Sequence, residues 1–478
     1  MTQNPENANV CPYSGASLTG APAGTSSAIG TPSPSNHSSP TTRAAQRPQT
    51  SAMELDVEDN TVKMETIAPP VGANVFYDPL SYATYDHPYD LYKQLRDKAP
   101  VYFSPRLGVY VLSRHEDVQA AFKNHEQLVS KFGNDIDGTH DSYGRGNLVA
   151  QDPPRHTALR QSVRRVFALR EVLAKEDGLR EVARRLISEM REKDGADFAA
   201  EFALPFAFAA STRLVGLPGE KHDIEWLAEH LVRSMERTVG ELGVPDDAAL
   251  SNEEAEVFIH DVVQKRLEEL AAGADPTVSD VITQVAAAVE KGKVDADEVV
   301  GLTHLIYSAS IDAPSALLTN SIYVLDKYPQ LQVFLRENPS MIPQFIEEVL
   351  RYETPGQNVS RQTTEDVVFS GVTIPANSRV MLLQGSANRD ERVFENPDDF
   401  DITRDFSKQN KLMSFGDGIH ACMGAPLARL MARVFIETLL EQPDEVRIVG
   451  FPERWVKQLV RGYSKLPIKF VPGGTTFG

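Results

Sequence analysis

A single cysteine in a glycine-rich loop, directly before a predicted helix, constrains this chain more than any other feature. The loop lies in residues 414–430, which read SFGDGIHACMGAPLARL, and the helix is predicted to start at Pro426. Backbone N–H groups of such a turn, together with the positive end of the helix, stabilise a thiolate at Cys422. Glycines in the loop let the backbone approach a flat ligand closely. A thiolate held in this way suits axial ligation of a haem iron, which predicts a metal-binding and catalytic role for Cys422.

The spacing around this cysteine distinguishes it from an inert one. A lone buried cysteine is ordinarily a small apolar residue whose packing needs no chemistry. Here six positions fill the pattern F-G-x-G-x-H-x-C-x-G, and they are Phe415, Gly416, Gly418, His420, Cys422 and Gly424. We therefore interpret Cys422 as a haem ligand.

The two cysteines, together with the lack of a signal-like or membrane-spanning stretch, predict a cytoplasmic protein. The other cysteine, Cys11, is far away in sequence, so no disulfide framework is expected and a reducing compartment fits. No basic segment followed by an apolar one opens the sequence, and the most apolar short stretch, 202–210, has nine residues. A membrane helix needs roughly 20. With 48 basic and 67 acidic side chains, the chain lacks a nucleic-acid footprint. We expect a monomer that binds neither nucleic acid nor membranes.

The sequence predicts a low-complexity N-terminal tail followed by one large domain. Between residues 11 and 50, 30 of 40 positions are Ser, Thr, Pro, Ala or Gly, which bury too little apolar surface to offset the entropy of ordering. We expect a disordered tail over 1–72 and a domain over 73–478. Helical spacing of apolar residues dominates 155–350, and a β-like stretch follows over 366–383. The predicted fold class is mainly α with a smaller β part.

The cysteine loop resembles that of the cytochrome P450 family, and other segments match this family in order and spacing. Glu348 and Arg351, in EEVLR, match its E-x-x-R helix, and Arg404 matches the third member of its buried Glu-Arg-Arg network. One carboxylate and two guanidiniums can make charge-assisted hydrogen bonds that hold the segment before the cysteine loop. The resemblance covers residues from about 75 to 470. It implies the P450 fold, in a single large haem-binding domain.

The resemblance also implies which side chains contact the haem. In QDPPRHTALR, His156 and Arg160 match the family's D-P-P-x-H-x-x-x-R pattern, and their spacing of four places both on one helix face. Arg361 matches a further propionate-binding arginine, and His420 has the same role within the cysteine loop. Such donors make chemical sense because buried carboxylates need partners. The expected contacts with haem b are His156, Arg160, Arg361, Phe415, His420 and the axial ligand Cys422.

A member of this family is expected to be a haem-thiolate monooxygenase, which inserts one oxygen atom from O2 into an organic substrate. No flavin or nicotinamide domain follows, and no second cysteine cluster could hold an iron–sulfur centre. Electrons are therefore expected from a separate ferredoxin and its NAD(P)H-dependent reductase. A basic face for such an acidic donor could include Arg160, Arg164, Arg165 and Arg170. A haem protein without turnover is the alternative from another class, and the presence of both Cys422 and Asp312 argues against it.

The predicted helix over 302–325 departs from the family pattern. The family usually shows A-G-x-[D/E]-T there, whereas this chain has Asp312 followed by Ala313 and Pro314. Asp312 keeps the acid and is the second expected catalytic residue, as a source of protons, but Ala313 replaces the alcohol. Pro314 lacks an N–H, so it should kink the helix and free the carbonyl of Ser310, which could then hold a water.

Three interpretations of this departure stay open. In the first, an ordinary monooxygenase hydrates its groove differently. In the second, the substrate supplies a hydroxyl that assists proton delivery. In the third, the enzyme is a peroxygenase, which uses hydrogen peroxide and does not activate dioxygen.

The substrate is expected to be small and mainly apolar. The segments GSANRD, DDFDITR and LVRGYSKLPIKF look most like bacterial members that oxidise small aromatic acids and methoxyaromatics. This suggests O-demethylation or hydroxylation in aromatic compound catabolism, with a terpenoid or polyketide-like substrate as the alternative. The expected substrate-pocket residues are Ser308, Ala309, Ser310, Ala313, Asn358, Val359 and Tyr463.

Overall fold

Helices and a smaller β part build the domain, as the sequence predicts. The computed structural model describes residues 75–138, 144–217, 221–275, 277–406 and 412–473. Residues 67–478 form one compact unit. The tail predicted over 1–72 lies outside the described residues, so its disorder stays a prediction.

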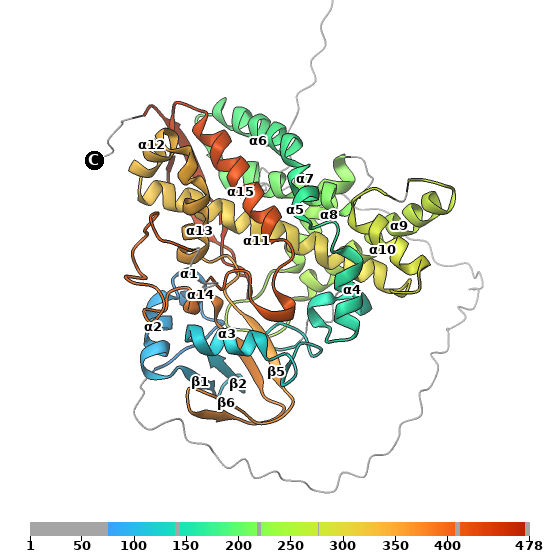
Figure 1. The fold of residues 1–478 in the computed structure, drawn as a ribbon. Coiled ribbons are helices and arrows are strands. Elements are labelled where there is room, and N and C mark those ends of the chain that lie inside the picture. Colours follow the sequence, from blue (N-terminus) through green and yellow to red (C-terminus); the bar gives the residue numbers. More distant parts are fainter. Residues whose placement is uncertain (1–74, 139–143, 218–220, 276, 407–411, 474–478) are drawn as a thin grey trace, which may run out of the picture. The chain divides into compact units, whose positions relative to one another are not determined.

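Fifteen α-helices occur in the described residues, and none of them is both long and apolar enough to cross a membrane (Figure 1). They are α1 (Tyr82–Asp86), α2 (Tyr89–Lys98), α3 (His115–Lys123), α4 (Arg155–Val163), α5 (Leu169–Leu173), α6 (Glu176–Arg191), α7 (Leu204–Val215), α8 (Lys221–Ser234), α9 (Asp246–Ala271), α10 (Val281–Glu290), α11 (Glu298–Lys327), α12 (Gln330–Glu337), α13 (Ile342–Tyr352), α14 (Gln384–Ala387) and α15 (Ala425–Leu440).

The long helix α11 forms the centre of the core. It is apolar on nearly all sides, which is the pattern of a helix buried by neighbours all round. Leu302, Leu317 and Ile322 belong to the largest apolar cluster, together with Leu430 and Val434 of α15. Figure 1 shows α11, in yellow, passing close to α15, in red, and α13 also packs on it. The helix that holds Asp312 and the helix that follows the cysteine loop are therefore packed directly together.

The β part consists of one five-stranded sheet and smaller sheets. The large sheet has the order β1-β2-β8-β5-β3, in which β2 and β8 run parallel and the other neighbours antiparallel. A three-stranded sheet has the order β4-β12-β9, and β6-β7 and β10-β11 form pairs. The strands are β1 (Val101–Ser104), β2 (Val109–Leu112), β3 (Leu128–Val129), β4 (Ala196–Asp197), β5 (Val359–Thr363), β6 (Val367–Phe369), β7 (Val372–Ile374), β8 (Arg379–Leu382), β9 (Glu445–Ile448), β10 (Glu453–Arg454), β11 (Tyr463–Lys465) and β12 (Pro467–Val471).

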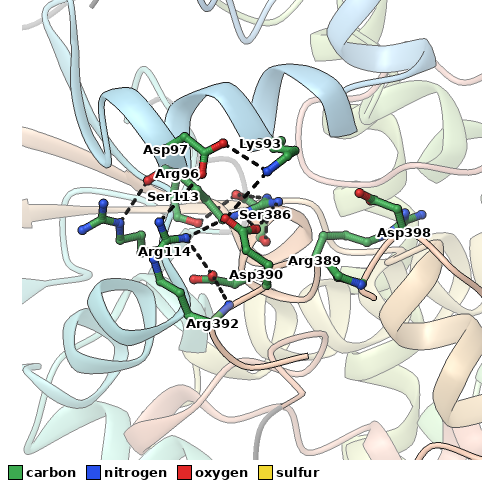
Figure 2. Close-up of polar contacts among 12 residues, drawn as sticks. Lys93, Arg96, Asp97, Ser113, Arg114, Ser386, Arg389, Asp390, Arg392 and Asp398 are labelled. Atoms are coloured by element: carbon green, nitrogen blue, oxygen red, sulfur yellow. Dashed lines mark hydrogen bonds and ion pairs between the residues drawn. The ribbon is translucent and has the colours of Figure 1, made fainter. Parts of the chain in front are cut away.

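Buried arginines connect α2 with the segment after α14 (Figure 2). Arg96 donates from Nε to Glu391 Oε2 at 3.1 Å and from Nη1 to the carbonyl of Ser386 at 3.2 Å. The guanidinium of Arg389 lies between the rings of Tyr89 and Tyr352, 4.0 and 3.8 Å from their centroids. Cations over aromatic faces and on carboxylates keep their charge compensated inside the protein. These contacts fix the segment that leads toward the cysteine loop.

Pro314 lies inside α11, yet the helix continues from Glu298 to Lys327. Proline has no N–H to donate to the carbonyl four residues earlier, that of Ser310. The hydroxyl of Ser211, on α7, lies 2.9 Å from this carbonyl and 2.7 Å from the carbonyl of Ala207. The freed carbonyl therefore faces a protein hydroxyl, where the sequence suggested a water.

We expect Ser211→Ala to lower the free energy of unfolding by about 0.5–1.5 kcal/mol, because it removes the hydroxyl donor next to the part-buried carbonyl of Ser310. In a Pro314→Ala background the loss should be clearly smaller, since residue 314 then has an N–H for that carbonyl. Urea unfolding of the four proteins measures the coupling between the two positions.

Ser321→Ala is the matched control for this coupling. Ser321 also bonds back to a carbonyl within α11, that of Leu317, which keeps its own helical N–H donor. Its cost should not depend on residue 314. Equal costs of Ser211→Ala in both backgrounds would contradict the assignment of Ser211 as the substitute donor.

Candidate active site

The cysteine loop folds back on itself just before α15. The N–H of Cys422 donates to the carbonyl of Phe415 at 2.9 Å, which closes the loop. Burial raises the pKa of the Cys422 thiol, whereas hydrogen bonds from the N–H groups of Gly424 and Ala425 and the nearby guanidinium of Arg160 lower it. The donors around the sulfur therefore offset part of the cost of burying a thiolate, as expected at a helix N-terminus, although the pKa of the thiol stays raised.

Two glycines allow this loop to pack against α3. Gly416 and Gly418 have φ values of +64° and +69°, a region that side-chain-bearing residues rarely adopt. A Cβ atom at Gly418 would clash with the carbonyl oxygen of Phe122, and one at Gly416 would lie 3.3 Å from the Phe122 ring. The loop can take this path only with glycine at these positions.

A cavity with largely apolar walls separates the cysteine loop from α11. Cys422 borders it from one side, and Ala309, Ser310 and Ala313 of α11 border it from another. The side chain of Cys422 is therefore accessible from the cavity, even though its sulfur lies deep in the protein. Further lining residues that carry no motif include Leu148, Val149, Phe167, Leu214, Leu305, Ile306 and Leu317. Apolar side chains of this kind look the same in sequence as ordinary core residues, so spacing could not identify them.

Cationic and donor side chains gather beside this cavity. Both ring nitrogens of His156 are buried and have no hydrogen-bond partner among the described residues, and its ring centroid lies 4.3 Å from that of His420. Nε2 of His420 lies 3.1 Å from the hydroxyl of Ser130. Arg160 donates to the carbonyl of Ala421 at 2.7 Å, and Arg361 is buried with one hydrogen bond, to the carbonyl of its neighbour Ser360.

Mutual repulsion among these groups shows in their pKa values. Burial, with Arg361, His156 and Arg160 nearby, lowers the pKa of His420 to about 2. Burial likewise lowers the pKa of Arg361 to about 10, although Asp152 opposes the shift. The guanidiniums of Arg160 and Arg361 carry positive charge that needs an anion to compensate it, and the uncharged ring of His420 adds a possible donor. The cluster therefore suits a ligand with negatively charged groups.

Comparisons with known proteins identify the family. The family model "Cytochrome P450" matches residues 250–442. Vitamin D(3) 25-hydroxylase of Pseudonocardia autotrophica is 31% identical over 411 residues, which span 83% of this chain and 97% of that protein. Cytochrome P450 123 of Mycobacterium tuberculosis is 31% identical over 400 residues, 82% of this chain and 96% of the relative. The chain belongs to the cytochrome P450 family. A solved structure of cytochrome P450 CREJ, in complex with (4-ethylphenyl) dihydrogen phosphate, is 25% identical with a TM-score of 0.73 and covers 83% of this chain and 99% of its own.

The P450 family uses haem b with an axial cysteine thiolate, and the residues present fit this group. Two carboxylates are the charge that the cluster of Arg160, Arg361, His156 and His420 lacks, and the unpartnered ring of His156 offers a donor. The thiol of Cys422 faces the same cavity. The chain is accordingly an oxidoreductase of the monooxygenase type, and bacterial P450s receive their electrons from ferredoxin and reductase partners.

The Glu348 carboxylate of this P450 holds the segment before the cysteine loop. Arg351 donates to it twice, from Nε and Nη2, at 2.8 and 2.7 Å. Nε of Arg404 lies 3.3 Å from Glu348, and the N–H of Asp401 donates to it at 2.8 Å. Arg351 also donates to the carbonyls of residues 388, 397 and 399. The structure thus brings the three predicted network residues together around a fully buried carboxylate.

Asp312 lies on α11 beside the cavity wall and is not one of its lining residues. Its Oδ2 accepts a hydrogen bond from Nζ of Lys457 at 2.7 Å, and both side chains are buried. Burial raises the pKa of Asp312, while Lys457 lowers it. Sequence reasoning missed Lys457. The one signal for it was a Lys-Gln pair enclosed by apolar residues in the run WVKQLV.

The remaining predicted pocket residues lie in two groups. Ala309, Ser310 and Ala313 line the cavity, as do the predicted haem contacts Arg160, Phe415 and His420. The other four predicted pocket residues do not line this cavity. They are Ser308, whose buried hydroxyl has no partner among the described residues, Asn358, which donates to the carbonyl of Gln458, Val359 in β5, and Tyr463, which packs against Tyr323 and Arg454.

We expect Glu348→Gln to lower the free energy of unfolding by about 3–5 kcal/mol, because it leaves Arg351 buried without its counter-ion. Glu347→Gln is the matched control, since the neighbouring Glu347 pairs with Arg429 near the surface and should cost about 1 kcal/mol or less. Urea unfolding of the two variants compares them. A similar loss from both would contradict the assigned role of Glu348.

Proposed function

We propose that this P450 is a monooxygenase that inserts one oxygen atom from O2 into a small, mainly apolar organic substrate in the cytoplasm. The observation that supports this most is the shared cavity. Cys422 and the apolar wall of α11 at Ala309 and Ala313 border the same cavity. A substrate held there would lie between the metal ligand and the helix that carries Asp312.

The residues that would hold haem b are Cys422 as the axial ligand, and Arg160, His156, Arg361 and His420 on its carboxylates. The chemistry supplied by the bound haem is the reductive activation of dioxygen and the insertion of one of its oxygen atoms. The protein contributes a thiolate stabilised by the N–H groups of Gly424 and Ala425. Its apolar walls orient the substrate by shape and exclude water from the reacting centre.

Asp312 is the proposed source of protons. Its carboxylate is buried, and burial favours the protonated form of an acid. The neighbouring position 313 has only a methyl group, so no hydroxyl there can pass the proton on. Since Asp312 is paired with Lys457, its carboxylate must leave Lys457 before it can hold a proton toward the cavity.

An aromatic substrate, oxidised by O-demethylation or hydroxylation, is the proposed class. Flat and small apolar residues, such as Phe167, Ala309 and Pro314, line the cavity. The relative CREJ was crystallised with an aryl phosphate, which supports aromatic substrates among similar proteins. A terpenoid-like substrate is the alternative, supported by the name of the vitamin D(3) 25-hydroxylase relative.

The proposed docking face for an acidic ferredoxin lies around α5. Arg160 is not part of it, because it lines the cavity and donates to the carbonyl of Ala421. Leu169 and Leu173 of α5 are 63% and 45% exposed and border a surface groove that α15 also lines. Apolar contacts framed by positive charge are typical of electron-transfer docking sites. The exposed arginines beside them are Arg164, Arg165 and Arg170.

A peroxygenase is the second candidate, and Ala313 is the observation that favours it. A peroxide-driven enzyme receives both oxygen atoms and the needed hydrogens with its oxidant, so it has less need for a relay hydroxyl on α11. Asp312 separates the two candidates, because only dioxygen activation needs protons delivered by the protein.

We expect Cys422→Ser to abolish substrate oxidation and to move the Soret band of the reduced carbon monoxide complex away from its thiolate position. A serine oxygen is a different ligand from a thiolate and donates less electron density to the iron. Thermal unfolding should show that the variant is folded. Full oxidation activity in the serine variant would contradict the axial role of Cys422.

We expect Asp312→Asn to slow dioxygen-dependent turnover at least about tenfold while sparing peroxide-driven turnover, since an amide cannot deliver a proton. Both rates are measured on one preparation of each protein with the same substrate. An equal loss of both rates would count against proton delivery by Asp312. Unchanged dioxygen-dependent turnover would remove Asp312 from the proposed mechanism.

A further inference from the structure

The ion pair between Lys457 and Asp312 joins two separate elements at the cavity. Lys457 lies in the turn between β10 and β11, which the N–H of Trp455 closes by donating to the carbonyl of Gly462. Its side chain is 1% exposed, and Nζ lies 4.6 Å from the Trp455 ring centroid. A buried lysine keeps its charge only where a carboxylate compensates it. Asp312 is the carboxylate that does so here.

This turn lies against the edge of the cavity. The N–H of Gln357 donates to the carbonyl of Leu459, and Gly356 forms a β-bridge with Val460. Gly356 lines the cavity from this side. On the other side of the pair, Asp312 directly precedes the lining residue Ala313. The turn that holds Lys457 thus pairs with one lining residue and Asp312 precedes another, while neither side chain of the ion pair lines the cavity itself.

Three buried polar atoms, on α11, in the turn and in the segment that bonds to the turn, have no partner among the described residues. They are the hydroxyl of Ser308, Oδ1 of Asn358 and Nε2 of Gln458. Ser308 lies one turn before Asp312 on the same face of α11. Gln458 follows Lys457 directly, and its carbonyl accepts a hydrogen bond from Asn358. Unpaired polar atoms of this kind are rare and costly inside proteins, so a group that can bond to them is expected to enter.

We propose that Lys457 recognises a carboxylate on the substrate, and that this carboxylate displaces Asp312 from Lys457. Nε2 of Gln458 would be the second donor to the same carboxylate, because it is buried, unpartnered and adjacent in the turn. The inference rests on the proposed function, since it names the substrates of that cavity as acids with an apolar body. It makes Lys457 a specificity-determining residue.

The exchange costs little because each group finds a new partner. Lys457 exchanges one carboxylate for another, so its charge stays compensated. Asp312 gains the unpartnered hydroxyl of Ser308 as a donor one helical turn away. The carboxylate released in this way is the one that the proposed mechanism needs for proton delivery.

The entering acid adds one negative charge, which uptake of one proton by Asp312 neutralises. Burial already raises the pKa of Asp312, and loss of Lys457 as its partner removes the contribution that lowers it. Glu236, on the turn after α8, interacts with both members of the pair, and burial also raises its pKa. Arg233 of α8 lowers the pKa of Glu236, and Asp247 of α9 raises it. Binding of an acid would thus load Asp312 with a proton only when a substrate is present.

Optical titration of the ferric holoenzyme with 4-ethylbenzoic acid and its methyl ester tests this inference. The two probes share one apolar body and differ in the carboxylate. At neutral pH the acid should bind the wild-type protein about tenfold more tightly than the ester, which corresponds to 1.4 kcal/mol. Lys457→Met should bring the ratio of the two dissociation constants close to one while leaving that of the ester unchanged. Lys457→Arg should keep the preference for the acid.

The variant Asp312→Asn should strengthen binding of the acid, whereas Lys457→Met should weaken it. This second test does not require that the Lys457 variants fold. Asp312→Asn removes the competing carboxylate, so the acid should bind about tenfold more tightly than to wild type. The double variant Asp312→Asn with Lys457→Met, which buries no unpaired charge, should lose the preference for the acid and stay folded. Lys465→Met is the matched control, because Lys465 lies in β11 and pairs with Glu453 at the surface. It should leave both dissociation constants unchanged.

Several outcomes would overturn the inference. They are an ester that binds the wild-type protein as tightly as the acid, a wild-type Soret band that neither probe moves, a preference for the acid that survives Lys457→Met, and an acid affinity that Asp312→Asn does not increase. Binding of the ester alone would leave the proposed monooxygenase of apolar substrates intact. Failure of that function would show separately, as oxidation that persists in Cys422→Ser.

Discussion

The buried carboxylate of Glu348 is the contact on which the geometry of the site depends. It accepts two hydrogen bonds from Arg351, and the same guanidinium then donates to three backbone carbonyls between residues 388 and 399. Asn388 continues the chain of contacts, because its amide bonds to the N–H of Met413 and to the hydroxyl of Ser414, where the cysteine loop begins. A helix in the core thus fixes the position of the sulfur through a segment that has little regular structure of its own.

The cavity is chemically divided, and the division matches the two molecules that it has to hold. On one side, donors from α4, β5 and the cysteine loop surround space that suits carboxylates, and their pKa values are shifted toward the uncharged forms. On the other side, α11 and α7 contribute almost only carbon atoms. In the proposed function, the polar side would orient the cofactor and the apolar side would select a substrate by shape. The polar atoms behind α11 add a third environment, small and directional, next to the apolar one.

The parts of the site that the sequence could predict are those in which chemistry restricts the residue type. Cys422, the glycines of its loop and the Glu348–Arg351 spacing form local patterns, so neighbouring positions reinforce one another. Lys457 and Ser211 belong to no such local pattern. Each contacts α11 from an element distant in sequence, and a single lysine or serine gives no signal of its own. The pocket predictions at Asn358 and Tyr463 show the same limit. The segment of Asn358 does reach the cavity, at Gly356, but which side chain faces it depends on the register of short, irregular strands.

The hydroxyl of Ser211 has one hydrogen and two acceptors within reach, the carbonyls of Ala207 and Ser310. When it donates to Ser310, it replaces the N–H that Pro314 lacks. The dependence therefore runs in one direction, because Pro314 relies on Ser211 but Ser211 does not rely on Pro314. A chain that carries Ser211 keeps a donor for the Ser310 carbonyl whether residue 314 is proline or not, whereas a chain that carries Pro314 and loses Ser211 loses that donor. The order in which these positions can change during evolution is thus set by one hydrogen atom.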